Sequence, residues 1–302
     1  MRRSDVGRLV ALAAMWGLSF IFVRVLAPAL GVVPTVASRV LIGGLVLVAY
    51  CRLTGVDQGL ARHWRQYFVI GVVNSTLPFL FYAFAALHIP ASYSVILNAT
   101  TPLLTALLAV PWLGERLGVA KIGGLLAGVA GVALVARAGP VSPGPLFAAA
   151  VAACLGATTC YAVSGIYMKK YARGAKPLAI AAWSQVFAGV VLLPALPYAW
   201  PTAPLTPAIV GNVLGLAVVC SSVAYVLYYR LIADVGPTRA LTVAYLMPAF
   251  GMVWGALLLG ETITLPMLAG CALIIAGTLA VLRPRVAARA DALGGARERS
   301  CG

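Results

Sequence analysis

Ten apolar segments, each about as long as a membrane-spanning helix, limit what this chain can fold into. The 302 residues are 62% hydrophobic and only 10% charged, whereas a soluble domain carries about 25% charged residues. A helix of about 20 apolar residues crosses the hydrocarbon of a bilayer and satisfies its own backbone hydrogen bonds there. We therefore predict an all-α integral membrane protein with ten transmembrane helices. The segments are residues 7–26, 34–52, 67–87, 91–111, 117–136, 146–168, 177–198, 209–230, 238–259 and 265–283.

The chain also repeats itself at a shift of 146 positions. Glycines, a proline and a glutamate recur at unchanged spacing inside apolar segments, which indicates a duplicated unit of five helices. We predict a first repeat at residues 1–136, a second at residues 137–283, and a disordered basic tail at residues 284–302. The aligned pairs include Pro102/Pro248, Gly114/Gly260, Glu115/Glu261, Gly124/Gly270, Gly131/Gly277 and Tyr82/Tyr228.

Basic residues are distributed unevenly between the two sides of this predicted bundle. Of the 22 Lys and Arg residues, 19 fall in termini and connections on one side, Arg137 falls on the other, and Arg24 and Arg39 lie within spans. Cytoplasmic loops are rich in Lys and Arg, so both termini are predicted to be cytoplasmic. The net charge of +15 is then an orientation signal, and no nucleic-acid partner is expected.

The number of spans in each repeat also bears on function. Because five is an odd number, the second repeat must be inverted relative to the first. Inverted repeats are a recurrent plan of secondary transporters, which hold a solute near the membrane midplane between two halves. We therefore predict two inverted five-helix repeats around a central cavity.

Several short motifs carry a resemblance to a known family. They are Trp16-Gly17, Arg39 after Ala37-Ser38, the segment from Pro102 through Leu113-Gly114-Glu115-Arg116-Leu117 to Gly124, Gly128 and Gly131, and its partner Pro248, Gly260-Glu261, Gly270 and Gly277. With these motifs, residues 7–283 resemble the ten-helix EamA type of the drug/metabolite transporter superfamily, and most of all its bacterial amino-acid exporters. The resemblance implies a monomeric carrier of the bacterial inner membrane, with a cavity between two halves. By this resemblance, the carrier is expected to export amino acids or other small metabolites by alternating access and to need no cofactor.

Acidic residues are absent from the middle of the spans. All seven Asp and Glu residues fall in termini, connections or helix ends, and the two histidines lie in or near connections. Proton relays in carriers use buried carboxylates or histidines, so a facilitated, uncoupled exporter is the simpler hypothesis, with proton coupling through Glu115 or Glu261 as the alternative. Both glutamates stand at helix junctions, where each is expected to cap the helix that follows it.

Polar and aromatic residues near the middle of the spans are the candidate substrate-binding residues. An aromatic cavity with amides, hydroxyls and almost no charge suits a small zwitterion, aromatic or otherwise neutral, better than a phosphate, which needs several cations. For single hydroxyls, a hydrogen bond to the helix backbone is the ordinary alternative. The candidates are Trp16, Arg39, Tyr82, Asn98, Thr101, Thr158, Tyr161, Ser222, Tyr225 and Tyr245.

Two cations and two prolines within the spans have alternative interpretations. Arg39 either snorkels to the interface or faces the bundle, where it would order carbonyl groups or attract a substrate carboxylate, and Arg24 is expected to snorkel. Pro102 and Pro248 remove a backbone hydrogen bond near the middle of their helices. They are candidate hinge or cavity-lining residues, with a simple packing kink as the alternative.

Other functions are weighed against transport. A membrane enzyme would need a carboxylate pair for metal or a Ser/His/Asp set, and the spans contain neither, so no enzyme activity, metal site or cofactor is expected. A receptor or structural membrane protein would leave the duplication unexplained. Within transporters, the alternative cargo is other neutral or cationic metabolites or drugs.

Overall fold

The computed structural model describes residues 2–115, 118–137, 144–199, 201 and 204–282, and within these ranges every regular element is a helix. Nine helical segments there are long and apolar enough to cross a membrane, and the apolar helix Val243–Leu259 is shorter. The predicted all-α membrane fold is confirmed. The predicted tail at residues 284–302 and Arg116 lie outside the described residues.

The elements follow one another with short connections. The first half comprises α1 (Arg3–Leu30), α2 (Val32–Leu53), α3 (Leu60–Ile70), the π-helix η1 (Gly71–Thr76), α4 (Leu77–His88), α5 (Ala91–Asn98), α6 (Thr101–Leu113) and α7 (Val119–Arg137). The second half comprises α8 (Pro145–Tyr171), α9 (Pro177–Leu192), the 3-10 helix η2 (Leu193–Tyr198), α10 (Pro207–Leu214), the π-helix η3 (Gly215–Val223), α11 (Ala224–Val235), α12 (Pro237–Ala240), α13 (Val243–Leu259) and α14 (Leu265–Leu282).

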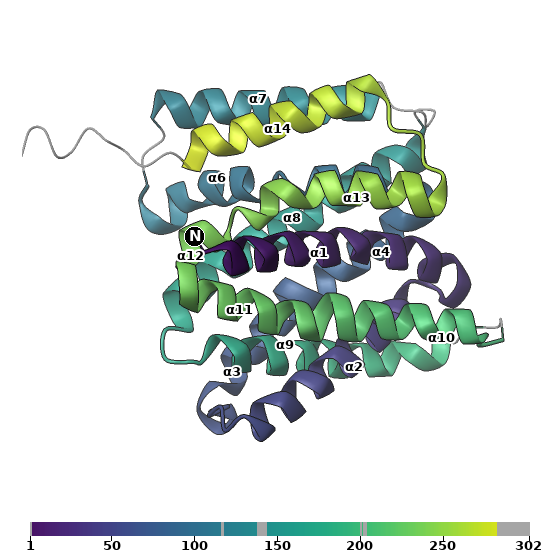
Figure 1. Ribbon diagram of the computed structural model, residues 1–302, viewed down its shortest axis with the longest axis vertical. Coiled ribbons are helices and arrows are strands. Elements are labelled where there is room, and N and C mark those ends of the chain that lie inside the picture. The colour runs from purple at the N-terminus through teal and green to yellow at the C-terminus, as the bar shows by residue number, and fades with distance from the viewer. Residues whose placement is uncertain (1, 116–117, 138–143, 200, 202–203, 283–302) are drawn as a thin grey trace, which may run out of the picture.

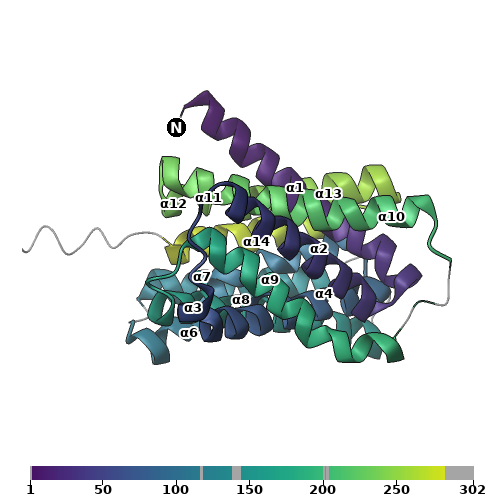
Figure 2. The same cartoon turned by 90° about the horizontal axis from the view of Figure 1, so that it is seen from below.

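The helices form one bundle whose two ends differ. Helices α7 and α14 lie side by side at one edge, α2 and α9 pack together at the other, and α1, α13 and α8 lie between them (Figure 1). The start of α1 and the end of α14 lie at the same end of the bundle, on the left of Figures 1 and 2. We call this the terminal end, and the opposite end, which carries the turn between α13 and α14, the distal end.

Glycines allow α7 and α14 to touch along their backbones. A Cβ atom on Gly124 would lie 2.5 Å from the carbonyl oxygen of Gly277, and one on Gly131 would lie 2.7 Å from that of Gly270. Residue numbers increase along α7 in the direction in which they decrease along α14, so the two helices run antiparallel. Since Gly124 aligns with Gly270 and Gly131 with Gly277 in the repeat, the contact is reciprocal, as an inverted duplication predicts.

Irregular backbone interrupts corresponding helices of the two halves. A shift of 146 positions places η1, residues 71–76, on residues 217–222, which lie inside η3. In the first half, the chain also breaks between α5 and α6, and Pro102 follows the break in the first turn of α6. In the second half, the corresponding break comes earlier, between α12 and α13, and Pro248 lies buried inside α13. The two prolines therefore occupy different local structures.

Candidate substrate-binding site

A cavity of about 320 Å³ lies between the two halves, and we call it the inner chamber. Its volume is at the lower end of the range for small-molecule sites, about 300–1,000 Å³. Arg39 is the one charged residue among the described residues that line it. The other polar or aromatic lining residues are Trp16, Ser19, Phe20, Asn74, Phe79, Tyr82, Asn98, Thr101, Tyr161, Tyr225 and Tyr228.

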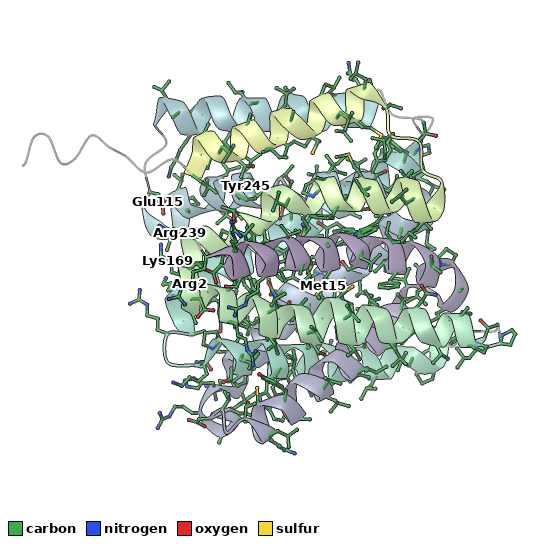
Figure 3. All side chains as sticks on the ribbon, in the orientation of Figure 1. Arg2, Met15, Glu115, Lys169, Arg239 and Tyr245 are labelled. Carbon is green, nitrogen blue, oxygen red and sulfur yellow. The ribbon has the colours of Figure 1, made fainter. Side chains whose placement is uncertain are left out.

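A second cavity of about 830 Å³, which we call the vestibule, adjoins the inner chamber. The two cavities share four lining residues, Thr101, Pro102, Leu241 and Ala244, so these residues stand where the cavities meet. Glu115, Lys121 and Lys169 line the outer part of the vestibule, and Figure 3 shows Glu115, Lys169 and Tyr245 toward the terminal end of the bundle. The vestibule therefore lies between the inner chamber and the terminal end.

Arg39 of α2 is held in the inner chamber by two contacts. Its Nε donates a hydrogen bond to the Ser221 hydroxyl of η3 at 3.1 Å, and its guanidinium carbon lies 3.8 Å from the centroid of the Phe79 ring. No carboxylate of the described chain forms an ion pair with it. The two terminal nitrogens of the guanidinium, which form the fork that fits a carboxylate, are therefore not occupied by an internal anion.

Two groups of aromatic rings line the chamber together with Arg39. In the first group, the Tyr82 ring lies 5.2 Å from that of Phe20 and 6.3 Å from that of Tyr161. In the second group, the Trp16 ring lies 5.2 Å from that of Tyr228 and 6.3 Å from that of Tyr225. These rings offer apolar and cation-binding faces around a single fixed cation.

The amide of Asn98 lines the chamber at the break between α5 and α6. Its Oδ1 accepts a hydrogen bond of 2.9 Å from the Tyr82 hydroxyl. This bond fixes the direction of the amide and leaves its NH₂ group as a donor at the chamber wall. The Thr101 hydroxyl donates to the Asn98 carbonyl at 2.8 Å, so Thr101 lines the chamber while its hydroxyl caps the end of α5.

Most of the predicted site residues come together, and three do not. Trp16, Arg39, Tyr82, Asn98, Tyr161 and Tyr225 line the inner chamber, Tyr245 lines the vestibule, and Thr101 and Pro102 line both. Thr158 and Ser222 are 0% and 2% exposed, and their hydroxyls donate to the backbone carbonyls of Leu155 and Gly43. Pro248 lines neither cavity.

Phe79 and Tyr228 line the chamber although the sequence did not single them out. Phe79 is one more phenylalanine in an apolar segment, and nothing in the sequence marks it as the ring beneath Arg39. Tyr228 had a usable signal, because it aligns with the candidate Tyr82 at the repeat shift. A chamber between two similar halves can be lined by equivalent residues of both, as it is here by Tyr82 and Tyr228.

Two charged residues are held differently from what the sequence predicted. Glu261 does not cap α14, the helix that follows it. Its carboxylate instead accepts hydrogen bonds from the backbone N–H groups of Ala91 and Ser92, at the start of α5 in the other half. Arg24, expected to snorkel, donates to the carbonyl of Ala86 in α4, so its charge is used at a helix end.

The sequence of the chain matches a known transporter family. The model of the EamA-like transporter family matches twice, at residues 7–137 and 148–283. The chain belongs to the EamA-like transporter family. It is therefore a multi-pass membrane transporter, and the resemblance seen in its motifs is confirmed.

Two relatives and one solved structure indicate how far the similarity extends. A Bacillus subtilis protein named uncharacterized transporter YvbV is 26% identical over 260 residues, which cover 85% of this chain and 84% of that protein. A Streptantibioticus cattleyicolor protein named probable terminal-alkyne amino-acid exporter is 26% identical over 299 residues, covering 95% and 96%. A crystal structure that is 21% identical covers 93% of this chain and 97% of its own, with a TM-score of 0.67, and shows the same fold.

Proposed function

We propose that this EamA-family transporter exports small metabolites that carry a free carboxylate, above all neutral or aromatic amino acids, by facilitated alternating access. The vestibule opens to the cytoplasm of a bacterial cell, where both termini lie. In this orientation the basic residues of the terminal end face the side on which Lys and Arg accumulate. The name of the Streptantibioticus cattleyicolor relative, an amino-acid exporter, supports the same class of cargo.

One observation carries the proposal: Arg39 lies in a chamber whose described lining holds no acidic side chain. Desolvating a cation without a counterion is costly, so this lining favours an anionic group as guest. A carboxylate would meet the terminal guanidinium nitrogens, since Nε is already bonded to Ser221. The aromatic rings would enclose the substrate side chain, and the Asn98 amide and tyrosine hydroxyls would serve its remaining polar groups.

The same lining argues for facilitated transport. The described lining of the inner chamber contains no Asp, Glu or His, which are the groups that relay protons in carriers. The two glutamates weighed as proton carriers have other partners. Glu115 forms an ion pair with Lys121 at 2.8 Å, and Glu261 accepts hydrogen bonds from the start of α5. Transport is therefore expected to follow the substrate gradient alone.

The test is solute flux into proteoliposomes that contain the purified protein. The panel pairs each amino acid with its decarboxylated amine and with its carboxamide, so that size and ring are held constant while the carboxylate is removed. We expect flux of neutral and aromatic amino acids, with the amine and carboxamide at least about tenfold slower, because one charge-assisted contact is worth about 1.5–3 kcal/mol. Amines carried as fast as amino acids would instead assign the protein to cationic metabolites or drugs.

Coupling is tested in the same vesicles with an imposed proton gradient at constant substrate concentration. We expect equilibration of the substrate without accumulation. Accumulation driven by the gradient would overturn the facilitated mechanism while leaving the identity of the cargo intact.

A further inference from the structure

The turn between α13 and α14 carries a carboxylate that crosses from one half of the molecule to the other. Gly260 adopts a left-handed conformation with φ +64°, which turns the chain so that Glu261 points away from the helix that follows. Its Oε1 lies 2.6 Å from the N–H nitrogen of Ala91, and its Oε2 lies 2.9 Å from that of Ser92. Residues about 170 positions apart are thereby joined at the distal end.

We propose that Glu261 is a positioning residue of the transport cycle: a latch that holds the distal end closed while the vestibule is open. The inference rests on the proposed alternating access, in which the two ends open in turn. Release of substrate at the distal end then requires that Glu261 leave the first turn of α5.

The chemistry of the contact suits a latch. The first turn of a helix exposes N–H groups without intrahelical partners and carries the positive end of the helix dipole. A carboxylate that accepts from two of these N–H groups forms two charge-assisted hydrogen bonds, which are stronger than neutral ones. Within the described chain, Glu261 has no Lys or Arg partner, so the start of α5 is what balances its charge.

The position of Glu261 links this contact to the closure of the chamber. Helix α5 begins at the latch and packs on α13, where a Cβ atom on Gly251 would lie 2.5 Å from the Val95 side chain. Gly251 also lies against α1, since a Cβ atom on Gly17 would lie 2.8 Å from the Gly251 nitrogen. Helices α1, α5 and α13 are thus in close contact beside the residues that line the chamber, and moving α5 away from α13 would separate them.

A glycine makes room for the carboxylate. A Cβ atom on Gly255 of α13 would lie 2.6 Å from Oε2 of Glu261. Because that neighbour is the end of a flexible side chain, Gly255→Ala displaces the carboxylate without moving a backbone. This substitution disturbs the latch while it keeps every charge, which makes it an independent second variant beside Glu261→Gln.

The experiment measures the opening of the distal end directly, without any substrate. Spin labels are placed at Leu87 near the end of α4 and at Leu265 at the start of α14, which are 37% and 77% exposed, after replacement of the native cysteines. Distances between the two spin labels are measured by pulsed electron–electron double resonance spectroscopy in lipid nanodiscs. The parent, Glu261→Gln, Gly255→Ala and the control Glu115→Gln are compared, and a melting curve of each protein verifies that it is folded.

We expect a longer distance to appear or grow in both latch variants, with the ratio of open to closed populations rising about tenfold or more, since a charge-assisted hydrogen bond is worth about 1.5–3 kcal/mol. Glu115 aligns with Glu261 in the repeat but lies at the vestibule, so Glu115→Gln should leave this distance unchanged. Distributions in Glu261→Gln and Gly255→Ala that match the parent would overturn the latch. If the distances shift while no amino acid is transported, the proposed cargo is wrong and the latch stands.

Discussion

Replacing Arg39 by Gln is the sharpest test of how the inner chamber selects its cargo. The substitution removes the one charge of the described chamber lining and keeps an amide that can still donate to Ser221. Glutamine also fits the surrounding fold, because the chain itself carries Gln185 at the position that aligns with Arg39 at the repeat shift. The variant therefore separates loss of charge from loss of structure.

The expected size of the effect follows from the contacts of Arg39. Its Nε and its flat face are already engaged by Ser221 and Phe79, so a carboxylate can form hydrogen bonds with the two terminal nitrogens only. Each charge-assisted bond contributes about 1.5–3 kcal/mol, and a glutamine amide recovers part of one. We expect a net loss of about 2–3 kcal/mol, which raises the half-saturating amino-acid concentration about 30- to 150-fold.

The assay is amino-acid flux against concentration in proteoliposomes, with binding followed by the shift in melting temperature. Arg39→Lys serves as the graded variant: it keeps the charge but loses the planar fork, so it should fall between the parent and Arg39→Gln. Gln185→Leu is the matched control, because Gln185 is fully buried and lines neither cavity. If Arg39→Gln binds and carries amino acids as the parent does, Arg39 is a structural cation and the reasoning fails.

Three further substitutions test the packing and the walls of the chamber. Gly124→Leu should lower the melting temperature in detergent by several degrees, because a Cβ atom there meets a backbone carbonyl at 2.5 Å and overpacking costs about 1–3 kcal/mol. Gly123→Leu is the control and should melt like the parent, since a Cβ atom there has nothing within 4 Å. Tyr82→Phe removes the bond that orients Asn98 and should weaken amino-acid binding about 3- to 10-fold, about 1 kcal/mol; unchanged binding would show that Asn98 does not touch substrate. Thr158→Val should leave flux unchanged, since its hydroxyl faces the backbone; a clear loss of flux would mean that the chamber extends further than described.

The sequence could predict the depth of a residue in the membrane far better than the side of the helix on which it lies. Thr158 and Ser222 stand at the expected depth, yet their hydroxyls bond to backbone carbonyls away from the chamber. A membrane helix that is apolar all round offers no amphipathic stripe to mark the inward face. Tyr82 and Asn98 were better candidates because a phenol and an amide at that depth need a partner, and each is the partner of the other.

Contacts between the two halves could not be predicted from the sequence either, and Glu261 shows why. From the sequence, the helix nearest to Glu261 is the one that follows it, so a local cap was the natural prediction. In the structure, the free N–H groups that it binds belong to α5, about 170 residues away. Which helix ends meet at a turn depends on how the two halves pack, and a repeat shift alone does not contain that information.

The duplication produces a nearly symmetric scaffold, but the polar site within it is one-sided. The pair Arg39 and Ser221 has its counterpart, at a shift of 146, in Gln185 and Ser75. The first pair is hydrogen-bonded and its Arg39 lines the inner chamber, whereas Gln185 and Ser75 are fully buried and find no hydrogen-bond partner within the described chain. A symmetric pair of cations would repel one another across so small a cavity. A single cation, placed by one half and hydrogen-bonded by the other, would bind one carboxylate while both halves remain in contact with it, as the proposed transport between two moving halves requires.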